Sequence, residues 1–147
     1  MTGSIRRIGF SRVERDRSRN RVIAPVLFGG PDAGVWEYDG RTWVKVAPST
    51  APSVRQTYGL TYDASGRRLV LAGGQGSGRG PYLDDFWSWD GREWVKLVDN
   101  DGVPPGRGGG QFFIDAAVRR WVYFGGYDNS PHRDLWVRVG GRWQKVD

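Results

Sequence analysis

Apolar and polar residues alternate with a period of two along most of this chain, which is the pattern of half-buried β-strands. The middle of the chain shows the alternation most clearly. There it predicts four short strands, at residues 57–62, 68–72, 85–89 and 93–97. Turn residues separate these strands, and no segment has the 3.6-residue period of an amphipathic helix. The pattern therefore predicts an all-β fold.

A unit of about fifty residues occurs three times, and two tryptophans seven residues apart mark each copy. The pairs recur after 51 and then 49 residues, and they are Trp36 and Trp43, Trp87 and Trp94, and Trp136 and Trp143. Upstream of each pair, an apolar run ends in two glycines. These diglycines are Gly29-Gly30, Gly73-Gly74 and Gly125-Gly126, and the third run begins at Trp121. We expect the glycines to allow close approach of two backbones, and the tryptophans to fill the space between neighbouring sheets.

Residues typical of tight hairpins lie between the two tryptophans of each unit. Asp39-Gly40 and Asp90-Gly91 are pairs that two-residue hairpins prefer, and Gly140-Gly141 occupies the third position. The chain is thus predicted to form one domain, residues 1–147, of three four-stranded units at about 8–47, 55–98 and 107–147.

These residues resemble the kelch repeat, in the bacterial, galactose oxidase-like form with a Trp-x-x-Asp-Gly-x-x-Trp hairpin. The resemblance implies that each unit is one four-stranded blade of a β-propeller. It also implies an arginine eight residues before an aspartate, which Arg55 and Arg107 match. The first unit departs from the pattern as though residues 23–25 were inserted, and its arginine is Arg6 or Arg7.

Three blades are too few to close a propeller, because propellers have four to eight. The open faces of the first and third blades need a cover, and two copies related by a two-fold axis supply one as a six-bladed homodimer. A piece of a longer propeller, a half that pairs with a different partner and an engineered half-propeller are the alternatives. In this view, a charge at Trp121 or Trp143 is expected to give monomers or insoluble protein.

Composition removes several classes of chemistry. The chain has no cysteine and one histidine, which excludes disulfides, thiolate zinc sites, iron–sulfur clusters and a histidine metal cage within one chain. We expect no metal and no cofactor. The net charge is +6, of which residues 1–21 hold +5, so a nucleic-acid partner is not expected. The absence of a long apolar run and of a signal sequence predicts a soluble, cytoplasmic protein without a membrane partner.

Candidate binding residues lie in long loops that the propeller arrangement brings to one face. Arg55 and Arg107 either fix these loops, which is the favoured interpretation, or form an arginine ring for carboxylates, phosphates or sulfated sugars. Asp84, Asp85 and Asp134 are expected to accept arginine or backbone hydrogen bonds. The remaining candidates are Arg79, Tyr82, Tyr127, Asp128, Asn129, His132 and Arg133. Tyr82 and Tyr127 are suited to stacking on a sugar or an aromatic side chain, and a metal shared by two copies of His132 is disfavoured.

The predicted function is a non-catalytic interaction module that binds a protein, peptide or glycan on its loop face. A carbohydrate epimerase or lyase, using Arg55 or Arg107 with Asp101 or Asp128, is the weaker alternative. A purely structural assembly unit is the third. The arginine-rich segment 12–21 is either a basic arm or, as favoured here, a solvated surface that suppresses edge pairing.

Overall fold

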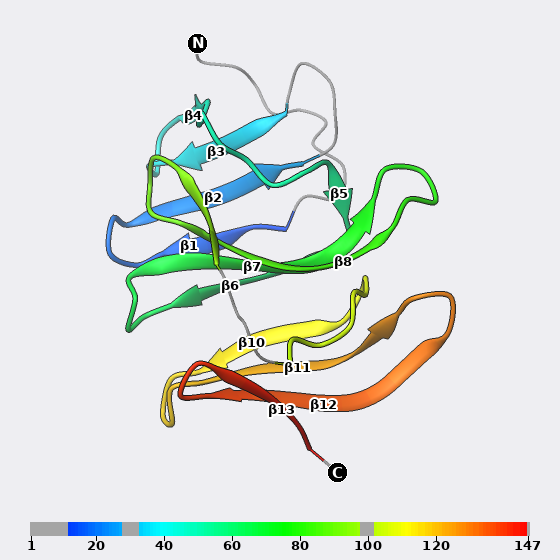
Figure 1. The fold of residues 1–147 in the computed structure, drawn as a ribbon. Helices are drawn as coiled ribbons and strands as arrows, with labels where there is room; N and C mark the ends of the chain where they lie inside the picture. The colour runs from blue at the N-terminus through cyan, green and yellow to red at the C-terminus, as the bar shows by residue number, and fades with distance from the viewer. Residues whose placement is uncertain (1–11, 28–32, 98–101, 147) are drawn as a thin grey trace.

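The computed structural model describes residues 12–27, 33–97 and 102–146, and these residues form an all-β fold of three antiparallel sheets (Figure 1). The described residues contain no helix, so none of them could cross a membrane as a long apolar helix. The three sheets follow one another along the chain. We refer to them as the N-terminal, middle and C-terminal sheets.

Each sheet contains the strands of one predicted unit, and strands that follow one another along the chain pair with each other except at β5. The N-terminal sheet consists of β1 (Glu14–Asp16), β2 (Arg21–Val26), β3 (Gly34–Tyr38) and β4 (Trp43–Val46). The middle sheet consists of β5 (Arg55–Gln56), β6 (Gly59–Asp63), β7 (Arg68–Gly76), β8 (Tyr82–Trp89) and β9 (Trp94–Leu97). The C-terminal sheet consists of β10 (Gln111–Asp115), β11 (Arg120–Tyr127), β12 (Pro131–Val139) and β13 (Arg142–Val146). Strands β5 and β6 both pair with β7. They are two separate strands because the extended conformation is interrupted at Thr57, whose φ is +55°.

The hairpins between the paired tryptophans differ from the prediction in two of the three sheets. Tyr38 pairs with Trp43, and Trp89 pairs with Trp94, so four residues form each loop instead of two. The aspartate side chain explains the longer loop, because Asp90 Oδ1 accepts the amides of Arg92 and Glu93 at 2.8 and 2.9 Å. Only the Gly140-Gly141 hairpin has the predicted two-residue form within the described residues.

The apparent insertion at residues 23–25 is wrong as a structural interpretation. Ile23, Ala24 and Pro25 lie inside β2 and pair with residues 35–37 of β3. Ala24 faces Trp36 in the same way that Leu71 faces Trp87 in the middle sheet. An alignment of the three units by their diglycines makes residues 23–25 look inserted, because the first unit has three more residues between its turn aspartate and its diglycine.

The sheets stack with a constant polarity. We call the face that carries the paired tryptophans the tryptophan face, and the other the opposite face. The tryptophan face of the middle sheet, with Leu71 and Trp94, packs on Ile23 and Val35 of the N-terminal sheet. The tryptophan face of the C-terminal sheet in turn packs on the opposite face of the middle sheet. The buried residues of this contact are Val70, Ala72 and Phe86 from the middle sheet and Phe112, Trp121, Tyr123 and Trp143 from the C-terminal sheet.

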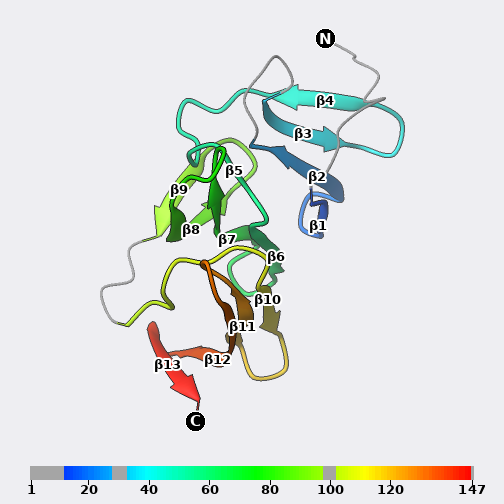
Figure 2. The same cartoon turned by 90° about the vertical axis from the view of Figure 1, so that its right-hand side faces the viewer.

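The three sheets spread like a fan (Figure 2). Strands β1, β6 and β10, one from each sheet, lie together, because β6 contacts both β1 and β10. The last strands, β4, β9 and β13, lie apart. Each sheet is therefore rotated relative to its neighbour, and the described strands do not close into a ring.

Candidate functional site

A buried arginine joins two parts of the middle sheet. Arg55 is 1% exposed, and its Nη1 and Nη2 donate to the two carboxylate oxygens of Asp85 at 2.5 and 3.0 Å. The remaining N–H groups donate to the Gly73 carbonyl, the Ser53 carbonyl and the Ser53 hydroxyl. All five N–H donors of this guanidinium are thus used within the sheet and its leading loop.

The same arrangement recurs in the C-terminal sheet. Arg107 is also 1% exposed, and it donates to Asp134 and to the carbonyls of Gly125 and Pro105. In both sheets a tryptophan two residues after the aspartate completes the cluster, because Trp87 and Trp136 donate their indole N–H to Asp85 and Asp134 at 2.7 and 2.8 Å. Sequence reasoning missed this bond, although the recurrence of Asp-x-Trp was available as a signal.

The N-terminal sheet lacks the carboxylate of this cluster. Gly34 stands two residues before Trp36, in the place of Asp85 and Asp134. Arg6 and Arg7, the candidate arginines of this unit, lie outside the described residues. The arginines at 55 and 107 therefore have the geometry of a scaffold that fixes loops, and no ring of free guanidinium groups forms from them.

The arginine bonds also set the charge state of the aspartates. Burial by itself raises the pKa of Asp134, but the hydrogen bonds from Arg107 and Trp136 and the Arg107 charge outweigh it and lower the pKa to about 2. The pKa of Asp85 is lowered in the same way, with burial opposing the bonds from Arg55 and Trp87.

Acid is therefore expected to weaken the fold through Asp134. Its folded pKa lies below the ordinary value of 3.8, so its contribution is complete above about pH 4 and is lost as the pH falls to about 2. We expect the free energy of unfolding to fall over this range, measured by denaturant titration. The fall should be smaller in Asp134→Asn, which has no carboxyl to titrate, and an equal fall in both proteins would contradict the assignment.

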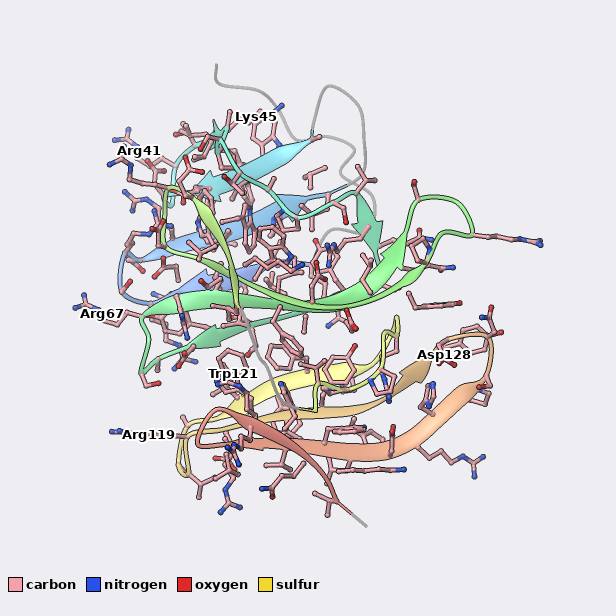
Figure 3. The ribbon with its side chains drawn as sticks, viewed as in Figure 1. Arg41, Lys45, Arg67, Arg119, Trp121 and Asp128 are labelled. Carbon is pink, nitrogen blue, oxygen red and sulfur yellow. The ribbon has the colours of Figure 1, made fainter. Side chains whose placement is uncertain are left out.

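The loop candidates gather at one end of the molecule, which Figure 3 marks with Asp128. The rings of Tyr82 and Tyr127 meet edge to face at 6.1 Å, and Tyr127 is about half exposed. Two main-chain hydrogen bonds to Gly108 hold Tyr127 in place. Arg79, Asn129 and Arg133 are exposed around this pair.

His132 lies beside Asp128 at the same end. Its Nε2 is 2.8 Å from Asp128 Oδ1, and this contact is the main reason that the pKa of Asp128 is lowered. The described residues contain no group of three or more side chains of the types that ligate metals. Asp101, a candidate of the catalytic alternative, lies outside the described residues.

The diglycine of the middle sheet is a place of close backbone approach. A Cβ at Gly73 would lie 3.0 Å from the carbonyl oxygens of Arg107 and Leu83, and its φ is +57°. The Gly74 amide donates to the Arg107 carbonyl at 2.9 Å, which joins the middle sheet to the loop before β10. Gly125 and Gly126 repeat the positive φ values, and Gly29 and Gly30 lie outside the described residues.

The two ends of the stack differ in exposure. On the opposite face of the middle sheet, Val70 and Ala72 are 0% exposed because the C-terminal sheet covers them. The equivalent positions of the C-terminal sheet are Val122 and Phe124, and Phe124 is 47% exposed. The other apolar residues of this open face are Phe113, Leu135, Val137, Val139 and Val146.

The tryptophan face of the N-terminal sheet is less open than the sequence predicted. Ala24, Val26 and Trp36 form a buried cluster with Trp43 at its margin, and Trp36 is only 7% exposed. Trp36 lies across from Ala24, and Lys45 Nζ lies 5.9 Å from the centre of its ring, so neighbours on the same face supply part of this cover.

Trp121 and Trp143 belong to the internal contact between the middle and C-terminal sheets, so they are not at a free end. Both are buried, and Trp143 lies 5.2 Å from Phe86 of the middle sheet. The predicted location at a seam between two copies is therefore wrong, because a charge at either position would disrupt the chain's own core.

Comparison with known proteins gives no family for this chain, because no family model and no curated protein matches it.

Proposed function

We propose that this chain is half of a six-bladed, kelch-type β-propeller that two copies complete, and that the ring is a non-catalytic interaction module. One observation carries the proposal. Positions that are fully buried in the middle sheet, Val70 and Ala72, have an exposed equivalent at Phe124 on the last sheet. An apolar face with this composition favours a cover of the kind that the other two sheets already have.

The stacking order selects the occupant of that face. Each internal contact places a tryptophan face on the opposite face of the preceding sheet. The matching surface for the open face of the C-terminal sheet is therefore the tryptophan face of an N-terminal sheet, supplied by a second copy. Two such contacts, related by a two-fold axis, cover the open faces at both ends of both chains. The arrangement of the sheets supports this assembly, because β1, β6 and β10 lie together and each sheet is rotated relative to the preceding one.

Trp36, on the face that the second copy would cover, is already buried in the single chain. Because Trp36, Ala24 and Val26 are already buried in the single chain, ring closure has to rearrange that face before the second copy can pack on it. Trp43 and Tyr38, which lie 5.1 Å apart on the same face, are partly exposed and offer the first contact.

Within the proposed ring, the loop end is the binding surface for a protein, peptide or glycan. Tyr82 and Tyr127 support this assignment, because an exposed aromatic pair on a fixed backbone suits stacking against a sugar or a side chain. The catalytic alternative loses support, because Arg55 and Arg107 are buried and paired with Asp85 and Asp134.

Two variants test the head-to-tail arrangement. Phe124→Glu places a charge on the open face of the C-terminal sheet, and Trp43→Glu places one on the tryptophan face of the N-terminal sheet. Each alone is expected to weaken the dimer about a hundredfold for each contact, because an unpaired charge costs about 3 kcal/mol and each variant places one in both contacts. An equal mixture of the two variants is expected to recover a complex with one intact contact, measured by light scattering.

Val118→Glu is the matched control, because Val118 is an exposed valine in the β10–β11 turn of the same sheet, and this variant should remain dimeric. Circular dichroism checks that all three variants fold. If Phe124→Glu separates the copies while Trp43→Glu leaves them joined, two C-terminal sheets contact each other and the head-to-tail ring is wrong.

A further inference from the structure

The charges of the molecule are divided between its two ends. We define the inner turns as residues 14–21, 63–68 and 115–120, which include the links from β1 to β2, from β6 to β7 and from β10 to β11 at the end opposite the loops (Figure 1). They contain eight arginines against four carboxylates. At the loop end, four arginines are matched in number by four aspartates, and two of the arginines form ion pairs with Asp85 and Asp134. The four arginines are Arg55, Arg79, Arg107 and Arg133, and the four aspartates are Asp84, Asp85, Asp128 and Asp134.

The carboxylates of the inner turns serve the turns themselves. Asp16, Asp63 and Asp115 each accept the amide of the residue two positions later, at 3.0, 3.1 and 3.0 Å. These bonds hold the three turns in the same conformation. Burial opposes a lowered pKa for Asp63, and the bonds from Ser65 and Gly66 outweigh it, so this side chain stays charged as part of the turn.

Several arginines of the inner turns remain available. Arg17, Arg67, Arg119 and Arg120 are exposed, and none of them forms an ion pair within the described part of the chain. Figure 3 shows Arg67 and Arg119 at the same end as Arg41, with Asp128 at the other. The arrangement presents separate cations from successive sheets on one surface.

The backbone conformation of the turns does not call for these arginines. Arg67 and Arg119 have φ values of +50° and +52°, in the region that favours glycine or asparagine. Asn20 takes the equivalent place in the first turn, with φ of +51°. An asparagine therefore fits all three positions, so the charge at two of them is not a requirement of the turn.

A depression lies between two of the inner turns. Its volume is about 260 Å³, and residues of both turns line it, including Ser65 and Arg119. Tyr62 of β6 and Ile114 of β10 also line it. A ligand on this surface can thus contact the middle and C-terminal sheets together.

We propose that the inner turns bind a chain of phosphate groups. Guanidinium groups pair with phosphate oxygens through two parallel hydrogen bonds, and cations spaced over successive turns match an extended polyanion better than a single ion. The inner turns contain no aromatic residue, and Tyr62 is the one aromatic residue among those that line the depression, so we assign recognition to the phosphates and not to a row of stacked bases. The surface exists in one chain and does not require the six-bladed ring.

The experiment compares two double variants with the same loss of charge. R67N/R119N removes two arginines of the inner turns and retains the turn conformation that Asn20 shows. R79N/R133N removes two exposed arginines of the loop end and is the control. The probes are inorganic polyphosphate and a single-stranded thymidine oligonucleotide. Their affinities are measured by competition and fluorescence anisotropy over a series of salt concentrations.

We expect the unmodified protein to bind with an affinity that falls as salt rises. The slope of log affinity against log salt should decrease by about 2 in R67N/R119N, which is about 1 for each arginine, and should not change in R79N/R133N. Binding of both probes supports phosphate recognition alone, and binding of one identifies whether inorganic or nucleic-acid phosphate is the source. Binding of neither probe, or an equal loss in both double variants, overturns the proposal.

Discussion

Replacing Arg55 by alanine is expected to lower the free energy of unfolding by about 3–5 kcal/mol, because it leaves Asp85 without its partner. The pair is largely enclosed, since the Arg55 side chain is 0% and the Asp85 side chain 14% exposed. The substitution also removes donors from the carbonyls of Gly73 and Ser53, which hold the leading loop to β7. Chemical denaturation followed by tryptophan fluorescence measures the change.

The control for this effect is an exposed arginine. Arg79→Ala, in the hairpin between β7 and β8, should change the free energy of unfolding by less than about 0.5 kcal/mol. In the double variant Arg55→Ala/Asp85→Ala, the loss should be smaller than the sum of the two single losses, because no charge is left unpaired. Additive losses would show that the two side chains do not act as a pair.

Replacing Trp121 by alanine is expected to cost about 3–5 kcal/mol of unfolding free energy, as large core truncations do. Trp121 fills the contact between two sheets, where its ring lies 5.8 Å from Phe112 and 6.3 Å from Phe86. The guanidinium carbon of Arg138 lies 4.6 Å from the centre of the same ring, so the substitution also removes a cation–π contact. The same denaturation assay measures this loss.

Phe124→Ala is the matched control, because Phe124 lies on the same strand but on the open face of the sheet. In protein dilute enough to be monomeric, its loss should stay below about 1 kcal/mol, since little apolar surface is buried there. Similar losses at Trp121 and Phe124 would contradict the difference between a covered and an open face. At concentrations where two copies associate, the Phe124→Ala loss should grow.

The strands and their order could be predicted from the sequence because their signals are local. Period-two alternation in β6 and β7, and the recurring tryptophan pairs, need no knowledge of the tertiary structure. The same local reading gave the wrong loop length at Asp39 and Asp90. There, an aspartate side chain competes with the backbone for the turn amides, and residue type alone does not report which partner is chosen.

The candidate site was harder to predict, because it depends on which side chains are buried together. The pattern identified Arg55 and Arg107 as equivalent and Asp85 and Asp134 as hydrogen-bond acceptors. The structure adds which arginine pairs with each aspartate. The net charge counted along the sequence also did not predict how the charge is divided between the two ends of the fold. Residues 22–147 carry only +1, yet Arg41, Arg67 and Arg119, from three distant segments, lie at one end of the fold. A net charge cannot report such a separation.

The mass of the unmodified protein in solution tests the six-bladed ring most directly. Size-exclusion chromatography with light scattering over a dilution series is expected to give a particle of twice 16.5 kDa, which dissociates only at low concentration. A particle of 16.5 kDa that persists at high concentration would contradict ring closure by two copies. It would also show that the exposed face around Phe124 does not bind a second chain.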